Sequence, residues 1–211
     1  MKYPIDYSVY LVISQRDCLD RDIFQVLEHA IQGGVSLVQL REKTMPTREL
    51  VALAKEMKVF LAQHNIPLII NDRVGVALAA NADGVHVGQD DMHPLDVRPL
   101  IGPERILGLS INTEAELQEA GTLPVDYLGI GPVFATQTKK DNKPVLGLEG
   151  LARLCRKKQV PAVGIGGITA RNASRVVSAG VEGIAVVSAI CGAESPKDAA
   201  AEFKKGLMTS T

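Results

Sequence analysis

The sequence predicts a single (β/α)8 barrel, and three observations favour this fold class. Apolar runs of strand length recur through the whole chain, each followed by a loop and a stretch with helical spacing. Strands that are apolar at nearly every position are typical of a parallel sheet covered by helices on both faces. Dividing the 211 residues among eight such units leaves about 26 residues per unit, which suits a compact barrel. We therefore expect residues 1–211 to form one domain.

The expected elements alternate in order along the chain. The strands are residues 9–13, 37–40, 68–70, 84–87, 106–109, 127–130, 162–165 and 183–187. The helices are residues 23–32, 48–63, 114–120, 148–158, 170–179 and 196–206, with shorter turns after Asp72 and Asp91. Thr113 and Glu116 form a helix capping box. A doubly wound open sheet is the alternative, but the first strand is not followed by a G-x-G-x-x-G dinucleotide motif.

Composition and charge exclude several classes of protein. Hydrophobic residues make up 46% of the chain and charged residues 22%, which is ordinary for a globular domain. A net charge of −1 and the absence of tryptophan argue against a nucleic-acid partner. The apolar runs are too short to span a bilayer, and the N-terminus has no signal-peptide core, so we expect a cytoplasmic protein without a membrane partner. A homo-oligomer remains an open alternative.

Cysteine and histidine patterns give little sign of thiol or zinc chemistry. Cys18, Cys155 and Cys191 form no C-x-x-C pair and are odd in number, as expected of reduced thiols. The four histidines have no zinc-ligand spacing. His86 alternates with valines on a strand, so we expect it to pack against a covering helix. Ser110 closes the fifth strand as a lone serine with no paired histidine, so it is not expected to be a nucleophile.

Two carboxylates, Asp72 and Asp91, follow the third and fourth expected strands. The carboxyl ends of parallel strands are where ligands bind in α/β folds. Oxygen ligands suit magnesium, which takes one or two protein carboxylates together with substrate phosphates. The pair therefore predicts a magnesium site. The alternative is that both residues are N-caps of helices that start near Val74 and Leu95.

Cationic and glycine-rich segments predict two anion subsites at the same end of the barrel. Alternation after the second strand places Gln39, Arg41 and Lys43 on one side, where the cations favour an anion, although a salt bridge to a neighbouring acid is an alternative. The turn around Gly167 and the segment after the eighth strand occupy the usual phosphate position of barrel enzymes. The residues alone indicate an enzyme that joins or splits a pyrophosphate compound and a monophosphate compound. A polar loop at about 134–147 is expected to be a mobile lid.

Five segments, in order along nearly the whole chain, together resemble thiamine-phosphate synthase. They are residues 38–43, 70–73, 84–92, 131–134 with 136–139, and 164–168. The resemblance implies a transferase that condenses hydroxymethylpyrimidine pyrophosphate with a thiazole phosphate and releases pyrophosphate. In this family the pyrophosphate is thought to leave first, and the thiazole nitrogen then captures a pyrimidine-methyl cation. No general base is required.

Matched positions imply a role for each site residue. Magnesium is implied to bind Asp72 and Asp91. The implied substrate-binding residues are Gln39, Leu40, Arg41, Glu42, Lys43, Asn71, Ser110, Thr136, Gln137, Thr138, Lys139, Gly167, Val187 and Ser188. Within this set Arg41, Lys43, Ser110 and Lys139 are implied to be catalytic, and Thr136, Thr138, Gly167, Val187 and Ser188 are implied to contact the thiazole phosphate.

Departures from the family pattern concern loops and leave two alternatives open. Ala135 stands where the family often has proline, His93 is inserted before Pro94, and Pro99 is expected to interrupt the following helix. A thiazole tautomerase-like barrel is one alternative, although the resemblance places its catalytic histidine where this chain has Pro132. A non-catalytic binding protein for phosphorylated ligands is the other.

Overall fold

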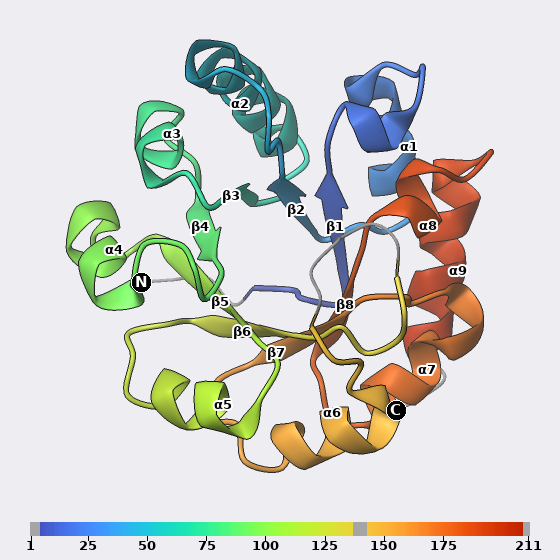
Figure 1. Cartoon of the computed structure of the whole chain (residues 1–211). Coiled ribbons are helices and arrows are strands. Elements are labelled where there is room, and N and C mark those ends of the chain that lie inside the picture. The colour runs from blue at the N-terminus through green and yellow to red at the C-terminus, as the bar shows by residue number, and fades with distance from the viewer. Residues whose placement is uncertain (1–4, 137–142, 209–211) are drawn as a thin grey trace.

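The eight strands close into one parallel barrel ringed by helices (Figure 1). The computed structural model describes residues 5–136 and 143–208. The strands are β1 Val9–Ile13, β2 Leu37–Leu40, β3 Leu68–Asn71, β4 Gly84–Val87, β5 Ile106–Ile111, β6 Tyr127–Ile130, β7 Ala162–Ile165 and β8 Gly183–Val186. Each strand pairs in parallel with the next, and β1 pairs with β8, with Val9 opposite Ile184. The predicted (β/α)8 fold is confirmed, and the doubly wound alternative is wrong because the sheet has no open edge.

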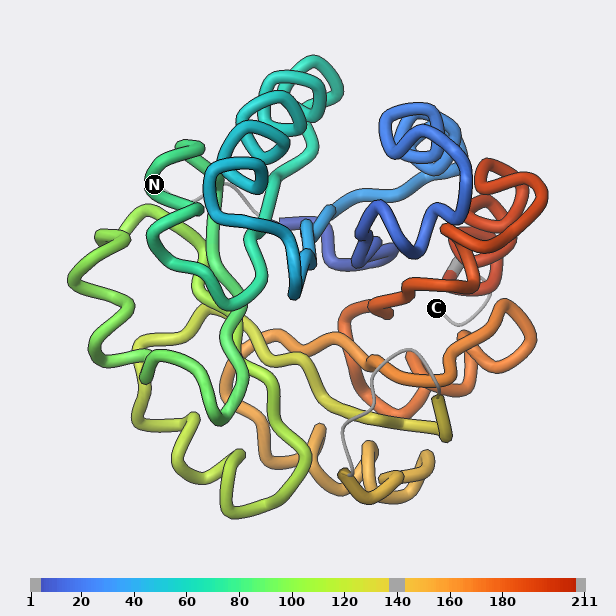
Figure 2. The backbone as a smooth tube through the Cα atoms, turned by 45° about the horizontal axis from the view of Figure 1, so that its top comes forward, coloured from blue at the N-terminus to red at the C-terminus, as the bar shows by residue number. Residues whose placement is uncertain are grey.

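The helices form an outer ring around the barrel, which Figure 2 shows along most of its circumference. They are α1 Ile23–Gln32, α2 Thr47–Ala62, α3 Val74–Ala79, α4 Pro94–Ile101, α5 Glu114–Ala120, α6 Gly147–Cys155, α7 Ala170–Ser178, α8 Ser188–Cys191 and α9 Pro196–Met208, with a 3-10 turn, η1, at Arg16–Cys18. The last helix, α9, packs against α1 and α7 and so covers the seam between the two ends of the barrel. None of the helices in the described ranges has the length and apolar character needed to cross a bilayer.

Local sequence signals account for several helix boundaries. Thr113 and Glu116 form the predicted capping box at the start of α5. The prediction that Pro99 interrupts its helix is wrong, since α4 continues through Pro99 to Ile101. The helix is only eight residues long, and burial of Val97 and Ile101 compensates for the one backbone hydrogen bond that proline cannot make. The short helix α8 was not expected from the sequence.

Two separate apolar clusters make up the core. The larger one lies between the strands and the helices. The smaller one fills the barrel, and it consists of Tyr7, Tyr10, Val12, Leu37, Ile69, Ile106, Tyr127, Val163 and Ala185. Successive side chains of a strand point to opposite faces, so alternate residues of β1 enter the two clusters. All three cysteines are buried and unbridged, as predicted for reduced thiols.

Candidate active site

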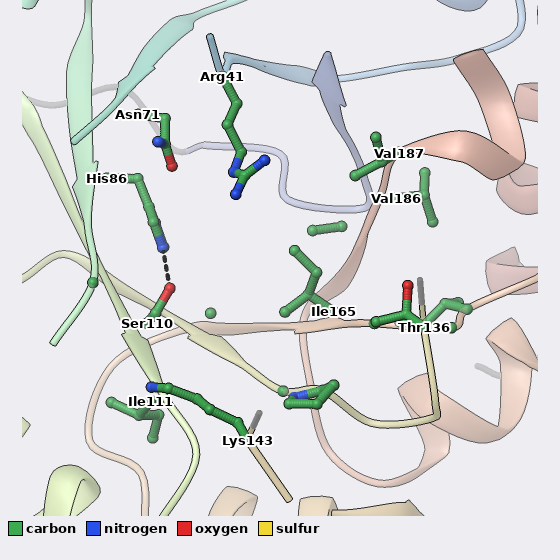
Figure 3. Close-up of a pocket in the computed structure, with 18 of the residues that line it drawn as sticks. Arg41, Asn71, His86, Ser110, Ile111, Thr136, Lys143, Ile165, Val186 and Val187 are labelled. Carbon is green, nitrogen blue, oxygen red and sulfur yellow. Dashed lines mark hydrogen bonds between the residues drawn. The ribbon is translucent and has the colours of Figure 1, made fainter. Parts of the chain in front are cut away.

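A cavity of about 620 Å³ opens where the carboxyl ends of the strands meet. Residues that follow β2, β3 and β4 line one side, and residues that follow β6, β7 and β8 line the other. Figure 3 shows Arg41, Asn71 and His86 on one side of this cavity and Thr136 and Val187 on the opposite side. Apolar side chains, including Ile111 and Ile165, form part of the wall between them. A cavity of this volume, with apolar walls and a few polar groups, can hold a small organic ligand.

Charged groups gather at the end of the cavity formed by β2, β3 and β4. Arg41 and Lys43 line it together with Asp72 and Asp91. The Lys43 ammonium group donates to the Asp72 carboxylate, and the Asp91 carboxylate accepts a 2.7 Å hydrogen bond from the Gly88 backbone N–H. Cations and carboxylates thus lie side by side, which suits a phosphate ligand that brings a divalent cation with it.

Asp72 occupies an electrostatically and conformationally costly position. Burial raises the pKa of its carboxyl, and the neighbouring Asp91 carboxyl raises it further, against the opposing effect of Lys43. Its backbone φ is 59°, in the left-handed region that residues other than glycine rarely adopt. Unfavourable charge and backbone geometry that a folded protein maintains are characteristic of functional sites.

Neither carboxylate caps a helix. The N-cap of α3 is Arg73, and the N-cap of α4 is His93, whose ring accepts from the Leu95 N–H. The capping alternative from the sequence is therefore wrong. Two adjacent carboxylates fit a magnesium ion that takes its remaining ligands from water and substrate. Within the described part of the chain no third acidic, histidine or cysteine side chain joins them.

A glycine turn lies at the opposite end of the cavity. After β7, Gly166 and Gly167 have φ values of 98° and 62°. A Cβ atom on Gly167 would lie 2.6 Å from the Ala135 carbonyl oxygen, so the turn has no room for a side chain. Val187 and Ser188 stand at the start of α8 and line the same region. Loops after the seventh and eighth strands, with a short extra helix, are the usual phosphate site in barrel enzymes.

His86 and Ser110 form a hydrogen-bonded pair in the wall of the cavity (Figure 3). The His86 Nε2 and Ser110 Oγ atoms are 2.8 Å apart, and the Nδ1 atom is 2.8 Å from the Tyr127 hydroxyl. The expectation that His86 packs against a covering helix is wrong, because its strand position points into the barrel. The statement that Ser110 lacks a histidine partner is also wrong, since the partner lies on the neighbouring strand β4.

Comparison with known proteins places this site in a family. The sequence model described as thiamine monophosphate synthase matches residues 9–190. A thiamine-phosphate synthase of Xanthobacter autotrophicus is 45% identical over 210 residues, covering 100% of both chains. One of Albidiferax ferrireducens is 48% identical over 197 residues, covering 93% of this chain and 90% of the relative. The chain belongs to the thiamine monophosphate synthase family. It is accordingly an enzyme of the transferase class.

Solved structures agree with this assignment to the thiamine monophosphate synthase family. A thiamine phosphate pyrophosphorylase from Pyrococcus furiosus superposes with a TM-score of 0.89 at 35% identity, covering 97% of each chain. A 3-hexulose-6-phosphate synthase from Salmonella typhimurium gives a TM-score of 0.73 at 14% identity, covering 97% of this chain and 100% of the other. The second likeness shows the shared barrel alone.

The structure brings most of the sequence-predicted site residues to this cavity of the thiamine monophosphate synthase barrel. Those that line it are Arg41, Lys43, Asn71, Asp72, Asp91, Ser110, Thr136, Gly167, Val187 and Ser188. Gln39 lies below the cavity, 4% exposed, and Leu40 is in the core. Glu42 accepts a hydrogen bond from the Gln15 backbone N–H at 2.7 Å. Gln137, Thr138 and Lys139 lie outside the described residues, as does the middle of the expected loop at 134–147.

Sequence reasoning missed three polar residues of the site. His86 was assigned to the wrong face of its strand, and Lys143 was not singled out as a ligand contact. Lys143 lines the cavity, with its ammonium 3.9 Å from the Glu116 carboxylate. Gln89 donates a 2.7 Å hydrogen bond to the Ser110 carbonyl and so links the ends of β4 and β5. The position of Gln89 just after β4, beside the predicted metal ligands, was the available signal.

Proposed function

We propose that this enzyme joins 4-amino-2-methyl-5-hydroxymethylpyrimidine pyrophosphate to 4-methyl-5-(2-hydroxyethyl)thiazole phosphate, giving thiamine phosphate and pyrophosphate. The observation that carries the proposal is the cavity with two unlike ends, one built from charged side chains and the other from a glycine turn. Two phosphorylated substrates need two anion sites on either side of the reacting centre. Membership of the thiamine monophosphate synthase family supports the identities of the two substrates.

The pyrophosphate would bind at the charged end. Arg41, Lys43 and Asn71 converge there from the ends of β2 and β3, and Ser110 adds a hydroxyl from β5. Arginine and lysine donate charge-assisted hydrogen bonds to phosphate oxygens. Lys139 is proposed to join them on the basis of the resemblance alone, since it lies outside the described residues.

Asp72 and Asp91 would hold the magnesium ion that accompanies the pyrophosphate. They fit the ion because their carboxylates are neighbours, and because the raised pKa of Asp72 reflects negative charge that a divalent cation would offset. When bound, magnesium would neutralise charge on the leaving pyrophosphate. Lys43 pairs with Asp72 and would contact the same phosphate oxygens.

The thiazole phosphate would bind at the end with the glycine turn. Gly167, Val187 and Ser188 line this part of the cavity, and Thr136 adds a hydroxyl. A phosphate held by backbone N–H groups needs close approach, which the glycine turn permits. Thr138 is a further proposed contact outside the described residues.

The proposed reaction is a substitution in which the leaving group departs first. The bond between the pyrimidine methylene carbon and the pyrophosphate oxygen breaks, and both electrons leave with the oxygen. The thiazole nitrogen then donates its lone pair to the cationic carbon, so the new C–N bond forms with no proton to remove. Arg41 and Lys43 would stabilise the charge that grows on pyrophosphate, which is the step where fixed charges contribute most. Apolar walls such as Ile111 and Ile165 would limit access of water to the cation.

Turnover of defined substrates tests the proposal directly. Purified enzyme should form thiamine phosphate from both substrates with magnesium, and the rate should fall when a chelator removes the metal. Binding of both ligands without turnover would instead support the non-catalytic alternative. Isomerisation of a thiazole phosphate without condensation would support the tautomerase-like alternative.

A further inference from the structure

A continuous chain of hydrogen bonds runs through the barrel interior to the cavity. Gln39 Nε2 donates to the Tyr10 hydroxyl at 2.6 Å, and the Tyr10 and Tyr127 hydroxyl oxygens are 2.7 Å apart. The Tyr127 hydroxyl is 2.8 Å from His86 Nδ1, and His86 Nε2 is 2.8 Å from Ser110 Oγ. The hydrogen-bond chain thus connects five strands and ends at Ser110, a side chain that lines the cavity.

Gln39 determines the polarity of this hydrogen-bond chain, that is, which group donates and which accepts in each bond. An amide nitrogen only donates, so the Tyr10 oxygen accepts from Gln39. Tyr10 is 1% exposed, and among the described residues its hydroxyl contacts only Gln39 and Tyr127. A buried hydroxyl proton left without an acceptor is costly, so Tyr10 donates to Tyr127. Burial also raises the pKa of both tyrosines, so each hydroxyl keeps its proton.

The polarity then determines which nitrogen of His86 carries the proton. Since the Tyr127 oxygen accepts from Tyr10, its own proton is donated to His86 Nδ1. A ring nitrogen that accepts a hydrogen bond is unprotonated, so the proton of the neutral imidazole lies on Nε2. His86 Nε2 therefore donates to Ser110 Oγ, and the serine proton is left for another acceptor.

We propose that Tyr10 and Tyr127 are positioning residues that hold His86 as the Nε2–H tautomer, which makes Ser110 a hydrogen-bond donor toward the bound ligand and not a nucleophile. The opposite polarity would place the lone pair of His86 Nε2 on the serine proton, as a catalytic base requires. The acceptor in the cavity would be a phosphate oxygen, and this identity of the acceptor rests on the proposed function. The tautomer itself does not depend on the substrate.

The absence of a side chain at Gly108 leaves room for the contact between the rings of His86 and Tyr127. At Gly108 of β5, a Cβ atom would lie 2.3 Å from Tyr127 Cζ and 2.4 Å from His86 Nδ1. The rings of His86 and Tyr127 have centroids 5.4 Å apart. Any side chain at position 108 would therefore push the two hydrogen-bonded groups apart, and glycine keeps the space open for them.

Nitrogen NMR of ligand-free protein labelled with 15N-histidine tests the tautomer. The His86 signals are identified as those missing from the spectrum of His86→Gln. We expect the wild type to show a protonated Nε2 and an unprotonated Nδ1. Tyr127→Phe removes the donor to Nδ1, so a fraction of the Nδ1–H form should appear. A wild-type protein protonated at Nδ1, or a Tyr127→Phe spectrum identical to the wild type, would overturn the proposal.

Tyrosine-to-phenylalanine variants distinguish a positioning role of the hydroxyl groups from a general effect on packing. Tyr127→Phe should lower kcat/KM by about tenfold, on the scale of one buried hydrogen bond. Tyr10→Phe should have a smaller effect, because Tyr127 can still donate to His86. The matched control is Tyr7→Phe. The centroid of the Tyr7 ring lies 5.2 Å from that of Tyr127, but the Tyr7 hydroxyl is not part of the hydrogen-bond chain. Equal losses in all three variants would contradict the positioning role. If Tyr127→Phe fails to fold, the wild-type nitrogen spectrum and the kcat/KM of Tyr10→Phe still test the proposal.

Mass spectrometry tests the role of Ser110 separately. Intact enzyme incubated with the pyrimidine pyrophosphate alone should show no covalent pyrimidinylmethyl adduct. An adduct that disappears in Ser110→Ala would show a nucleophilic serine and overturn the proposal. Failure of the enzyme to make thiamine phosphate, together with the expected His86 tautomer, would reject the proposed function but leave the positioning of His86 intact.

Discussion

Lys43 and Asp72 form an ion pair across the ends of the neighbouring strands β2 and β3. The side chain of Lys43 is 51% exposed, whereas that of Asp72 is 17% exposed. The pair therefore joins a solvated cation to a more buried carboxylate, and Asp91 adds a second negative charge beside it. Lys43 therefore offsets only part of the cost of the Asp72 charge, which is why we propose that a divalent ion binds here together with substrate phosphates.

Asp72→Asn and Asp91→Asn should each lower kcat/KM by about a hundredfold or more. Loss of even an outer-shell partner of a metal typically costs 10–100-fold, and these residues are proposed to touch the ion itself. Steady-state assays over a range of magnesium concentrations measure the effect, and Asp90→Asn is the control at the adjacent acid. A magnesium dependence unchanged in both variants would contradict the metal assignment.

Asp72→Asn should also raise the Tm of the metal-free protein. The raised pKa of Asp72 means that its ionised form costs stability in the fold, and asparagine tolerates the left-handed backbone well. The lost ion pair with exposed Lys43 contributes little by comparison. Thermal unfolding with a chelator present measures the change. Added magnesium should then stabilise the wild type more than the variant.

The gain in stability from Asp72→Asn should depend on pH. A carboxyl with a raised pKa costs stability fully above its folded pKa, and the cost disappears as the pH falls toward the ordinary value of 3.8. The Tm difference between variant and wild type should therefore be largest near neutral pH and shrink in acid. A difference that grows in acid would mean that Lys43 outweighs burial and Asp91.

Arg41→Ala should lower kcat and kcat/KM together, each by about a hundredfold. The guanidinium is proposed to stabilise charge that develops on pyrophosphate in the transition state, and such interactions affect kcat. Arg153→Ala, at an exposed arginine of α6, is the control. A rise in KM with kcat preserved would show that Arg41 only binds the substrate.

Gly167→Ala should weaken thiazole-phosphate binding by about tenfold or more while pyrimidine-pyrophosphate binding changes little. An added Cβ would meet the Ala135 carbonyl at 2.6 Å and displace the turn that forms the phosphate site. The matched control is Gly147→Ala, where φ is also positive, at 64°, but the added atom meets nothing within 4 Å. Calorimetry of each ligand checks this, and equal weakening of both would refute the two-subsite arrangement.

Much of the site could be predicted from sequence because its residues directly follow strands. In a parallel barrel all carboxyl ends meet at one mouth, so Arg41, Asp72, Asp91 and Gly167 were expected together before any coordinates were known. The resemblance to a known family supplied the roles of individual side chains. The continuation of α4 through Pro99 and the short helix α8 were not predicted, since packing outweighs local propensity in segments of one or two turns.

The sequence by itself determined the number and order of the strands, and which residues follow those strands at the mouth of the barrel. Only the tertiary structure decided which strand residues face inward. Every strand here is buried on both faces, so its apolar run carries no alternation that distinguishes the barrel interior from the helix side. In the closed barrel His86 of β4 lies inside, beside Tyr127 of β6 and Ser110 of β5.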